Sequence, residues 1–309
     1  MNQRDIPETT LLNIELNSSC NLRCKWCALD HSKPRIQMRV ETMEILFRQL
    51  AENRLPHLRR VDLHNAGETL LHADLPAMLS VIRRYKGKIP SKPVVGLLTN
   101  AMLLSEKKST QIIRSRAVDQ MRFSLDGGSE DAFEQIRVGA RWDVVRENIM
   151  KFLLLNRRAN APITTEAICI IEESPEKTAA FSPAFQELLS FMDKVSLRHP
   201  HNWDGSVEMG VDDSSFRAIA EKSVGEPCFL LMKNMVVLPD GSVTICCNDL
   251  NARGVMGTIY EQPLDAFVCH PMRMKMIELF RQGKKEQIDL CRRCTGFYSK
   301  PKKRMHDEA

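Results

Sequence analysis

No stretch of this 309-residue chain approaches the roughly 20 consecutive apolar residues that a bilayer-spanning helix needs. Its first residues, MNQRDIPETT, lack the basic and then apolar order of a signal peptide. The sequence also contains no internal repeat and no low-complexity segment. These absences argue against membrane-spanning, secreted and repeat classes, so we expect a cytoplasmic globular protein with no membrane partner.

The net charge of +5 is a mild excess, and its densest run, Lys300 to Arg304, is typical of a solvated chain end. We therefore expect no nucleic-acid partner. The ten cysteines fit metal ligation in a reducing compartment better than they fit disulfide bonds.

Three of the cysteines, Cys20, Cys24 and Cys27, form a C-x3-C-x2-C loop directly after the apolar run Leu11–Leu16. Three close thiolates suit a [4Fe–4S] cubane, which normally takes four, so one iron stays open. An open position on a metal leaves room for a small molecule. The alternative is a structural zinc site with His31 as the fourth ligand, but the spacing after a strand favours the cluster.

The first two-thirds of the chain alternate between β-rich runs and helical patterns. The expected strands are Leu11–Leu16, Arg60–His64, Val94–Leu98, Gln120–Leu125, Thr164–Ile171 and Lys194–Arg198. The expected helices are Val40–Leu50, Leu75–Arg84, Ser105–Arg114, Trp142–Leu155 and Glu176–Met192. This alternation predicts an α/β fold, a parallel sheet with outer helices that curls into part of a (β/α)6 barrel. Functional residues are then expected at the carboxyl ends of the strands.

The pattern changes near Val211, so we expect one domain over residues 1–210 and a second over residues 211–309. Met235–Leu238 and Ser242–Cys246 flank an Asp240-Gly241 turn, which predicts a β-hairpin. The sequence then predicts a helix over Pro271–Arg281.

The first cysteine motif, with Trp26 just before its last cysteine, resembles the signature of the radical S-adenosylmethionine (SAM) superfamily. The resemblance implies a partial, TIM-like (β/α)6 barrel whose open iron binds SAM. It also implies reductive cleavage of SAM to methionine and a 5′-deoxyadenosyl radical. A flavodoxin-like or ferredoxin-like electron donor is the implied partner.

The run Asn65-Ala66-Gly67-Glu68 after the second strand resembles the family's Gly-Gly-Glu motif, which implies contacts with the SAM amino group. Alanine replaces the first glycine, so Ala66 must avoid a positive φ and a very close backbone approach. Glu68 can still accept from an ammonium group. The alternative is an ordinary acidic surface turn.

The resemblance implies further contacts with SAM. Ser124 and Asp126 end the fourth strand and would contact the ribose and carboxylate, and Asn100 would line the adenosine pocket. Arg137 would pair with the SAM carboxylate, because a guanidinium forks onto a carboxylate. Trp26 would pack near the adenine, since an indole face suits a flat base. The alternatives are a polar strand cap and a surface charge. We call these residues, with Ala66, Gly67 and Glu68, the SAM cradle.

A second cysteine set lies near the C-terminus and resembles a twitch domain, the shorter relative of the SPASM domain, over residues 226–295. The set consists of Cys228, Cys246, Cys291 and Cys294. Four thiolates would close a second, auxiliary [4Fe–4S] cluster suited to electron transfer; the alternative is structural zinc. Cys246 and Cys247 point to opposite faces if they lie in a strand. Which of them is the ligand stays open, although spacing favours Cys246. Cys269 is expected to be a buried thiol.

A barrel with one auxiliary cluster resembles the radical SAM alcohol dehydrogenases of aminoglycoside biosynthesis. This implies oxidation of a secondary alcohol of a carbohydrate-like substrate, a sugar or aminocyclitol, with the second cluster as electron acceptor. The first alternative is an epimerase, in which Cys247 or Cys169 would return a hydrogen atom. The second is a peptide maturase, although the 19 residues before Cys20 leave no room for a leader-binding domain. The non-catalytic alternative is an iron–sulfur electron carrier, which would need no SAM cradle.

The run Arg198-His199-Pro200-His201-Asn202-Trp203-Asp204-Gly205 follows the sixth strand, and we call it the bridging segment. By position it opens into the barrel mouth, where it offers histidines of near-neutral pKa and an aromatic wall. We expect it to face the substrate, with His201 or Arg198 as proton acceptor or its orienting partner. The alternative is an interdomain linker whose Trp203 fills an apolar gap.

Overall fold

The computed structural model describes residues 6–160, 162–171, 181–208 and 225–295. Nine strands form one sheet in the order β6-β5-β4-β3-β2-β1-β7-β8-β9. The strands are β1 (Leu11–Ile14), β2 (Arg60–Leu63), β3 (Val94–Thr99), β4 (Gln120–Ser124), β5 (Thr164–Ile170), β6 (Lys194–Arg198), β7 (Asn234–Val237), β8 (Ser242–Thr244) and β9 (Val255–Thr258). Strands β1 to β6 pair in parallel in chain order, which confirms the predicted six-stranded partial barrel.

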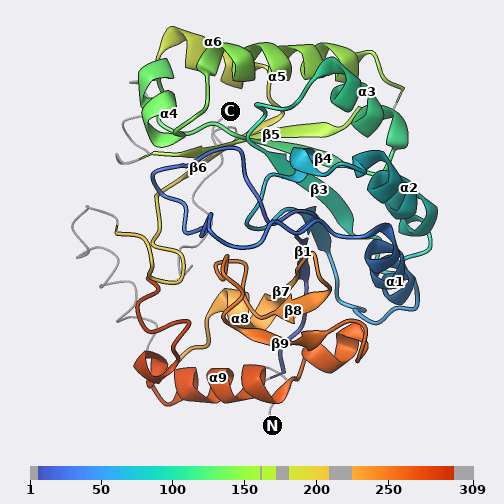
Figure 1. The fold of residues 1–309 in the computed structure, drawn as a ribbon, viewed down its shortest axis with the longest axis vertical. Coiled ribbons are helices and arrows are strands. Elements are labelled where there is room, and N and C mark those ends of the chain that lie inside the picture. The colour runs from blue at the N-terminus through green and yellow to red at the C-terminus, as the bar shows by residue number, and fades with distance from the viewer. Residues whose placement is uncertain (1–5, 161, 172–180, 209–224, 296–309) are drawn as a thin grey trace, which may run out of the picture.

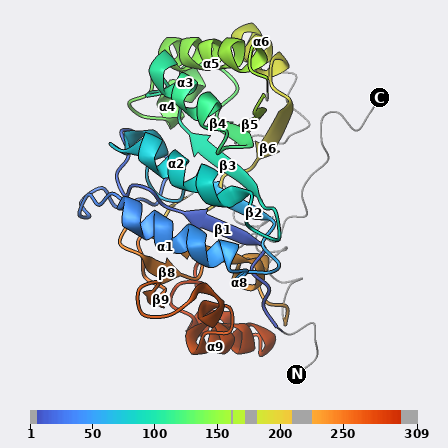
Figure 2. The same ribbon diagram turned by 90° about the vertical axis from the view of Figure 1, so that its right-hand side faces the viewer.

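Helices α1 to α6 lie along the outer side of these six strands, as the two views in Figures 1 and 2 show. The helices of this part are α1 (Val40–Ala51), η2 (Thr69–Leu71), α2 (Leu75–Lys86), α3 (Glu106–Ser115), α4 (Glu130–Ile136), α5 (Trp142–Arg157) and α6 (Pro183–Ser190). The C-terminal part adds α8 (Phe229–Lys233), η4 (Leu264–Phe267), α9 (Pro271–Arg281) and η5 (Lys285–Gln287).

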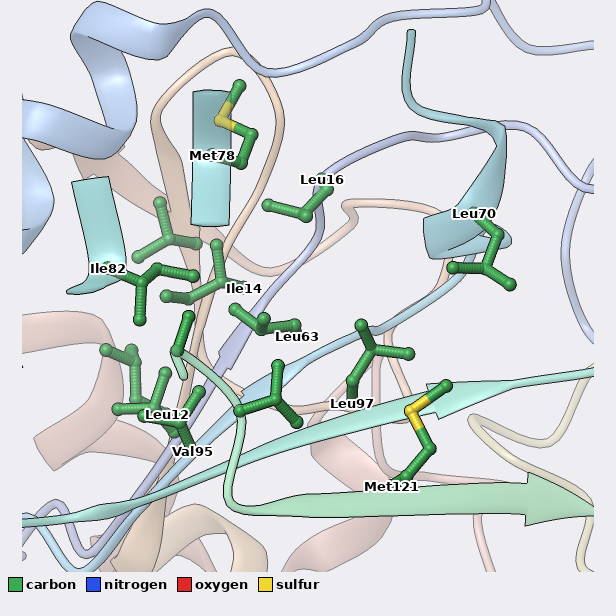
Figure 3. Packing of buried hydrophobic residues seen from close by; sticks show 14 of the residues in the cluster. Leu12, Ile14, Leu16, Leu63, Leu70, Met78, Ile82, Val95, Leu97 and Met121 are labelled. Carbon is green, nitrogen blue, oxygen red and sulfur yellow. The ribbon is translucent and has the colours of Figure 1, made fainter. Parts of the chain in front are cut away.

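Alternation along each strand sorts its side chains between the helices and the barrel interior. Figure 3 shows Leu12 and Ile14 of β1 and Leu63 of β2 directed toward Met78 and Ile82 of α2, within one buried cluster. The residues between them on each strand therefore face inward, and on β1, β2 and β4 they are polar. The helix-facing side thus forms the apolar core, and the inward side is left for polar chemistry.

The C-terminal part continues the barrel sheet at its other edge. Strand β7 pairs in parallel with β1, with Leu11 opposite Asn234, and β8 returns antiparallel to it. Gly241 in the predicted turn has a φ of 86°, and an added Cβ would lie 2.6 Å from the Tyr260 ring. The hairpin and the helix Pro271–Arg281 are confirmed. The predicted boundary at Val211 lies outside the described residues and stays a prediction.

Three local features differ from the sequence-based expectations. Helix α4 was not expected; Ser129 caps it, its hydroxyl accepting from the Ala132 N–H at 3.3 Å. Helix α6 begins at Pro183, and residues 176–180 of the longer predicted helix lie outside the described ranges. Cys269 is exposed rather than buried, because it lies in the short connection between η4 and α9. Within the described ranges, no helix combines the length and apolarity needed to cross a bilayer.

Candidate active site and its two cysteine sets

The loop after β1 carries the first cysteine set, and backbone hydrogen bonds fix its shape. The Cys27 N–H donates to the Cys24 carbonyl at 3.2 Å, and the Leu22 N–H lies 3.5 Å from the Cys20 sulfur. Burial raises the pKa of Cys20 to about 11. The surrounding protein therefore does not stabilise the thiolate, and bound iron would have to do so. Three neighbouring cysteines whose thiolates need a metal fit a cluster.

The motif after β2 packs tightly against this loop. Asn17 donates to the carbonyls of Ser19 at 2.7 Å and Glu68 at 3.2 Å, and the Glu68 N–H donates back to Ser19 at 2.9 Å. A Cβ on Gly67 would lie 1.8 Å from the Asn17 carbonyl oxygen, so only glycine fits there. Ala66 does not have a positive φ, as its side chain requires.

The Glu68 carboxylate is buried and fastens the motif to the end of β3. One oxygen accepts from the Leu70 N–H at 2.9 Å and the Thr99 hydroxyl at 2.8 Å, and the other accepts from the Asn100 N–H at 2.9 Å. Its contact with the SAM amino group stays a prediction. In the structure, the hydrogen bonds of the Glu68 carboxylate hold Thr99 and Asn100 beside the cysteine loop.

Asn100 then reaches the cysteine loop itself. Its side-chain nitrogen donates to the Asn21 side-chain oxygen at 2.9 Å and lies 3.9 Å from the Cys20 sulfur. An N–H directed at a cysteine sulfur is one of the levers that tune an iron–sulfur cluster. The predicted adenosine-lining residue is thus joined to a predicted cluster ligand.

Arg137 is buried between the end of β4 and the cysteine loop. Its guanidinium pairs with Asp126 at 2.7 Å and lies 3.9 Å from the Cys24 sulfur. Asp126 also accepts from the Ile170 N–H at 2.8 Å. The sequence predicts the SAM carboxylate as the partner of Arg137, and in the structure the Asp126 carboxylate already pairs with it. The Arg137 Nε has no hydrogen-bond partner among the described residues, so one donor remains for another acceptor such as the SAM carboxylate.

Two further cradle residues lie where the sequence predicts. Ser124 ends β4 on its inward face and is 8% exposed, and Trp26 is buried within the cysteine loop. With the glycine-only approach at Gly67 and the free donor of Arg137, these residues fit a bound SAM molecule. Their individual contacts with SAM stay predictions.

The second cysteine set gathers around one cavity. Cys228 precedes α8, Cys246 follows β8, and Cys291 and Cys294 share a turn in which the Cys294 N–H donates to the Cys291 carbonyl at 3.1 Å. All four line the cavity, while Cys247 does not. Burial, followed by the charges of the other three sulfurs, raises the pKa of Cys291. The geometry therefore favours Cys246 over Cys247 as the fourth ligand.

Polar contacts hold this cavity in shape. Asp249 accepts from the Thr244 hydroxyl at 2.6 Å and from the Arg253 and Gly254 N–H groups, each at 2.8 Å. These bonds fix the turn that follows Cys246. Lys285, which also lines the cavity, donates to the Cys294 carbonyl.

The bridging segment connects the two cysteine sets. Trp203 donates through Nε1 to the Trp26 carbonyl at 2.7 Å, and Asn202 donates to the Arg293 carbonyl at 2.8 Å. Asp204 pairs with Arg253 at 2.8 Å and lines the second cavity. These contacts favour the alternative interpretation, a linker whose Trp203 fills an interdomain gap, and the substrate-facing role stays a prediction.

Two predictions about reactive groups need correction. Burial, and then the charge of Arg198, lower the pKa of His201 to about 4, below the near-neutral value expected of it. Its Nδ1 already accepts from the Trp203 N–H at 3.0 Å. Cys169 lies in the helix-facing core with none of its surface exposed, because alternation along β5 turns it away from the barrel interior. Arg198 does lie on the inward face, at the exposed end of β6.

Several functional candidates escaped the sequence analysis because they flank motifs instead of belonging to them. Glu15 is buried just after β1 and accepts from the Asn65 side chain and the Ala66 N–H, each at 3.2 Å. His64 directly follows β2, and Arg122 lies in the middle of β4, both on the inward face. Period-two alternation, applied strand by strand, could have found all three.

Comparison with known proteins fits this geometry. A family model described as "Radical SAM superfamily" matches residues 14–181, and SPASM, described as "Iron-sulfur cluster-binding domain", matches residues 228–295. The chain belongs to the radical SAM superfamily and carries a SPASM domain. It is an enzyme whose radical SAM domain binds a [4Fe–4S] cluster and SAM, and whose SPASM domain binds auxiliary iron–sulfur clusters. The predicted cofactors are confirmed, and zinc is not needed at either site.

Two curated relatives differ in how much of their length is matched. The S-adenosyl-L-methionine-dependent 2-deoxy-scyllo-inosamine dehydrogenase of Niallia circulans is 22% identical over 296 residues, which cover 93% of this chain and 92% of that protein. Molybdenum cofactor biosynthesis protein 1 of Dictyostelium discoideum is 27% identical over 163 residues, 52% of this chain but only 24% of that protein.

Solved structures share the fold at low identity. BtrN in complex with AdoMet and 2-DOIA has a TM-score of 0.60 and 18% identity, with 94% of each chain covered. SuiB of Streptococcus suis, bound to the precursor peptide SuiA, has a TM-score of 0.65 and 15% identity, covering 87% of this chain and 67% of SuiB. These likenesses establish the architecture and leave the substrate to be inferred.

Proposed function

We propose that this protein is a radical SAM dehydrogenase that oxidises a secondary alcohol of a carbohydrate-like ring. The observation that carries the proposal is the pairing of a three-cysteine site with a separate four-cysteine cavity, joined through Trp26, Trp203 and Asp204. A closed second cluster has a chemical use when an electron must leave the substrate. The near full-length likeness to an aminocyclitol dehydrogenase supports the same reaction class.

The residues of the chain divide this work. When bound, SAM and the first cluster supply a 5′-deoxyadenosyl radical that takes the carbinol hydrogen atom, and the second cluster supplies the acceptor for the remaining electron. Gly67 and Asn17 fix the backbone beneath the SAM cradle, and Asp126 holds Arg137 beside Cys24. The inward-facing strand residues then orient the substrate C–H bond.

The hydroxyl proton needs an acceptor, and Glu15 suits this role better than His201. Glu15 is 4% exposed at the inward end of β1, next to the motif that follows β2. Burial raises its pKa to about 7, whereas the pKa of His201 falls to about 4. A general base works best when its pKa lies near the operating pH.

The alternatives receive unequal support. Epimerisation would need a thiol that faces the substrate; Cys169 faces the helices, which leaves Cys247. Peptide modification draws support from the likeness to SuiB, whose structure holds a bound precursor peptide. A purely structural electron carrier is disfavoured because it would need neither the glycine-only approach at Gly67 nor the free donor of Arg137.

Electrons for the first cluster would come from a flavodoxin-like or ferredoxin-like donor. A hollow beside the cysteine loop is lined by Cys20 together with the exposed Arg23 and Arg35. Small donors of this type are acidic, so these cations offer charge complementarity at a cluster ligand. Replacing both arginines by glutamate should slow flavodoxin-supported SAM cleavage and leave dithionite-supported cleavage unchanged; equal rates with flavodoxin would exclude this surface.

The test of the proposed reaction is a product analysis under anaerobic conditions. The reconstituted protein would be incubated with SAM, a reductant and a panel of ring alcohols that are neutral, acidic or, as in 2-deoxy-scyllo-inosamine, amine-bearing. Dehydrogenation predicts one ketone for each 5′-deoxyadenosine formed. Glu15→Gln should lower ketone yield more than SAM cleavage. An inverted alcohol that carries solvent deuterium at carbon, without a ketone, would instead identify an epimerase.

A further inference from the structure

The inward face of the barrel below the SAM cradle carries charged side chains to which the reaction outlined above assigns no individual role. Asp62 on β2 pairs with Arg60 at 2.7 Å and with Arg122 on β4 at 2.6 Å. Glu166 on β5 pairs with Lys194 on β6 at 2.8 Å. These ion pairs involve residues of four of the six barrel strands. We call this layer of inward-facing polar and charged residues the inward band.

Some polar atoms in this band remain without partners. Arg122 is 7% exposed, yet its Nε has no hydrogen-bond partner among the described residues, and neither has the side-chain oxygen of Asn65. The Arg122 guanidinium also lies 3.4 Å from Nδ1 of His64. Because a guanidinium only donates, Nδ1 accepts, and the His64 proton resides on Nε2. Buried polar atoms without partners call for a ligand or water that completes them.

The band also holds more positive than negative charge. Its inward cations are Arg60, Arg122, Lys194 and Arg198. Asp62 and Glu166 are its paired carboxylates, and burial raises the pKa of Glu15 to about 7, so Glu15 carries only part of a charge at neutral pH. Arg122 is buried, whereas Lys194 is partly exposed and Arg198 lies at the exposed end of β6. An excess of positive charge around a partly buried site favours an anion or a neutral acceptor and disfavours a further cation.

On the basis of the proposed function, we propose that this inward band binds a hydroxylated ring that is uncharged or acidic and rejects a ring that carries an ammonium group. The Arg122 Nε–H and the His64 Nε2–H donate to hydroxyl or carboxylate oxygens of the ring, and the Asn65 side-chain oxygen accepts from a hydroxyl. Discrimination comes chiefly from repulsion, since an ammonium would lie beside Arg122 and Arg198.

Three sugars that differ in charge test this proposal: D-glucose, D-glucuronate and D-glucosamine. Their binding to the reconstituted holoenzyme with SAM would be measured by equilibrium dialysis, with 5′-deoxyadenosine formation followed in parallel. Glucosamine should bind about tenfold or more weakly than glucuronate, because its ammonium group would lie beside like charges. Glucosamine binding as tightly as glucuronate would overturn the proposal.

Two variants sharpen the result. Arg198→Gln alters an exposed strand end and should reduce the difference in binding affinity between glucuronate and glucosamine. Arg122→Gln should reduce this difference further. Arg83→Gln, an exposed position on α2, is the control and should leave the difference unchanged. If no sugar binds while SAM is cleaved, the ring class is wrong and the radical SAM activity stands. If SAM is not cleaved at all, the proposed function fails first.

A second, independent observation concerns Arg273, whose side chain is fully buried on α9. It donates to the carbonyls of Leu231 at 2.9 Å and Asn234 at 2.8 Å. No ion pair joins it to a carboxylate among the described residues. A buried guanidinium held only by carbonyl dipoles keeps its positive charge without a neutralising partner.

This charge lies next to the second cysteine set. Leu231, which Arg273 contacts, and Met276, one turn along α9, both line the second cavity. We infer that Arg273 raises the reduction potential of the second cluster and so makes it a better electron acceptor. The physical reason is that nearby positive charge stabilises the reduced, more negative cluster. Arg273 is thus a tuning residue that does not itself touch the substrate.

The test is a potentiometric titration followed by electron paramagnetic resonance, with Cys20, Cys24 and Cys27 replaced by alanine so that only the second cluster reports. Arg273→Gln should lower its potential, and Arg273→Lys should keep it closer to wild type. Lys275→Gln, an exposed cation on the same helix, should leave it unchanged. Equal potentials in the Arg273→Gln and unsubstituted proteins would overturn the inference. Failure to load any second cluster would count against the proposed function instead.

Discussion

The two cysteine sites of this protein use the same ligand, the cysteine thiolate, but differ in openness and in charge. The first places three cysteines on one loop, and its buried cation, Arg137, is already neutralised by Asp126. The second collects four cysteines from a helix start, a hairpin end and a turn. Among the described residues, the hydrogen-bond partners of its buried cation, Arg273, are carbonyl groups. An open, charge-balanced site suits the binding of a small molecule. A closed site beside an uncompensated cation suits the uptake of an electron.

The bridging segment connects these two contrasting sites. Trp203 contacts the first loop through Trp26, and Asp204 lines the second cavity. One short segment therefore sets the relative position of a site that starts a radical reaction and a site that ends it. The comparison teaches that the two sites form one functional unit, although their cysteines lie at opposite ends of the sequence.

The sharpest way to break the comparison is to open the closed site. Cys246→Ala should remove the second cluster, about four irons per protein, because Cys246 lines the cavity. Cys247→Ala should retain all of the iron, since Cys247 does not line it. Anaerobic iron and sulfide counts on the two variants check this. A normal iron content in Cys246→Ala with a loss in Cys247→Ala would reverse the ligand assignment.

The charge balance of the first site can be broken at Arg137. Arg137→Gln leaves the buried Asp126 without its cation and should lower the free energy of unfolding by about 4 kcal/mol. SAM affinity should fall as well. Arg141→Gln is the matched control: it removes an exposed pair with Asp143, and the change should stay within about 0.5 kcal/mol. Urea unfolding and SAM equilibrium dialysis measure both effects, and similar losses in the two variants would refute the buried pair's special role.

The close packing beneath the SAM cradle can be tested at Gly67. An added Cβ would lie 1.8 Å from the Asn17 carbonyl oxygen, so Gly67→Ala should cost about 3 kcal/mol of unfolding free energy and weaken SAM binding. At Gly87 nothing lies within 4 Å of an added Cβ. Gly87→Ala should therefore change stability by about 1 kcal/mol at most. Thermal unfolding of the pair decides; an unaffected Gly67→Ala protein would mean that this backbone contact is absent in solution.

The smallest expected effect is a pH dependence of stability at His64, in the inward band and outside both cysteine sites. Burial, and then the charge of Arg122, lower the pKa of His64 to about 3, below its ordinary value near 6.5. Between these values the unfolded chain binds a proton that the folded chain does not, so stability rises with pH across this window.

Lowering the pH from 7 to 5 should therefore cost wild type about 2 kcal/mol more than His64→Gln. The difference between the two proteins isolates His64, because the raised pKa of Glu15 acts in the opposite direction in both. Urea unfolding at several pH values provides the comparison, and parallel pH profiles would show that His64 takes up a proton without difficulty.

Much of this architecture was predictable because it depends on local patterns. The strand–helix alternation, the Asp240-Gly241 turn and the helix at Pro271 each follow from short-range sequence signals. The cysteine spacing identified both sites, whereas the close approach at Gly67 is seen only in the structure. Motif reasoning succeeded where neighbouring residues in the sequence also act together in space.

The rest depended on contacts between distant parts of the chain. His201 looked like a neutral-pH base, but burial and Arg198 remove that property. Glu15, His64 and Arg122 acquire their roles only when parallel strands bring them to one inward face. The partner of Arg137 was expected to be a ligand, and the fold supplies Asp126 first. Sequence reasoning sees the residue types, whereas pairing and burial belong to the three-dimensional structure.

The most direct test of the central claim is to count iron and sulfide, and to assay SAM cleavage, in anaerobically reconstituted protein and in a Cys20→Ala/Cys24→Ala/Cys27→Ala variant. We predict about eight irons in the unsubstituted protein and about four in the variant, with SAM cleavage lost only in the variant. Equal iron contents would mean that the first cysteine loop holds no cluster, which would contradict the account.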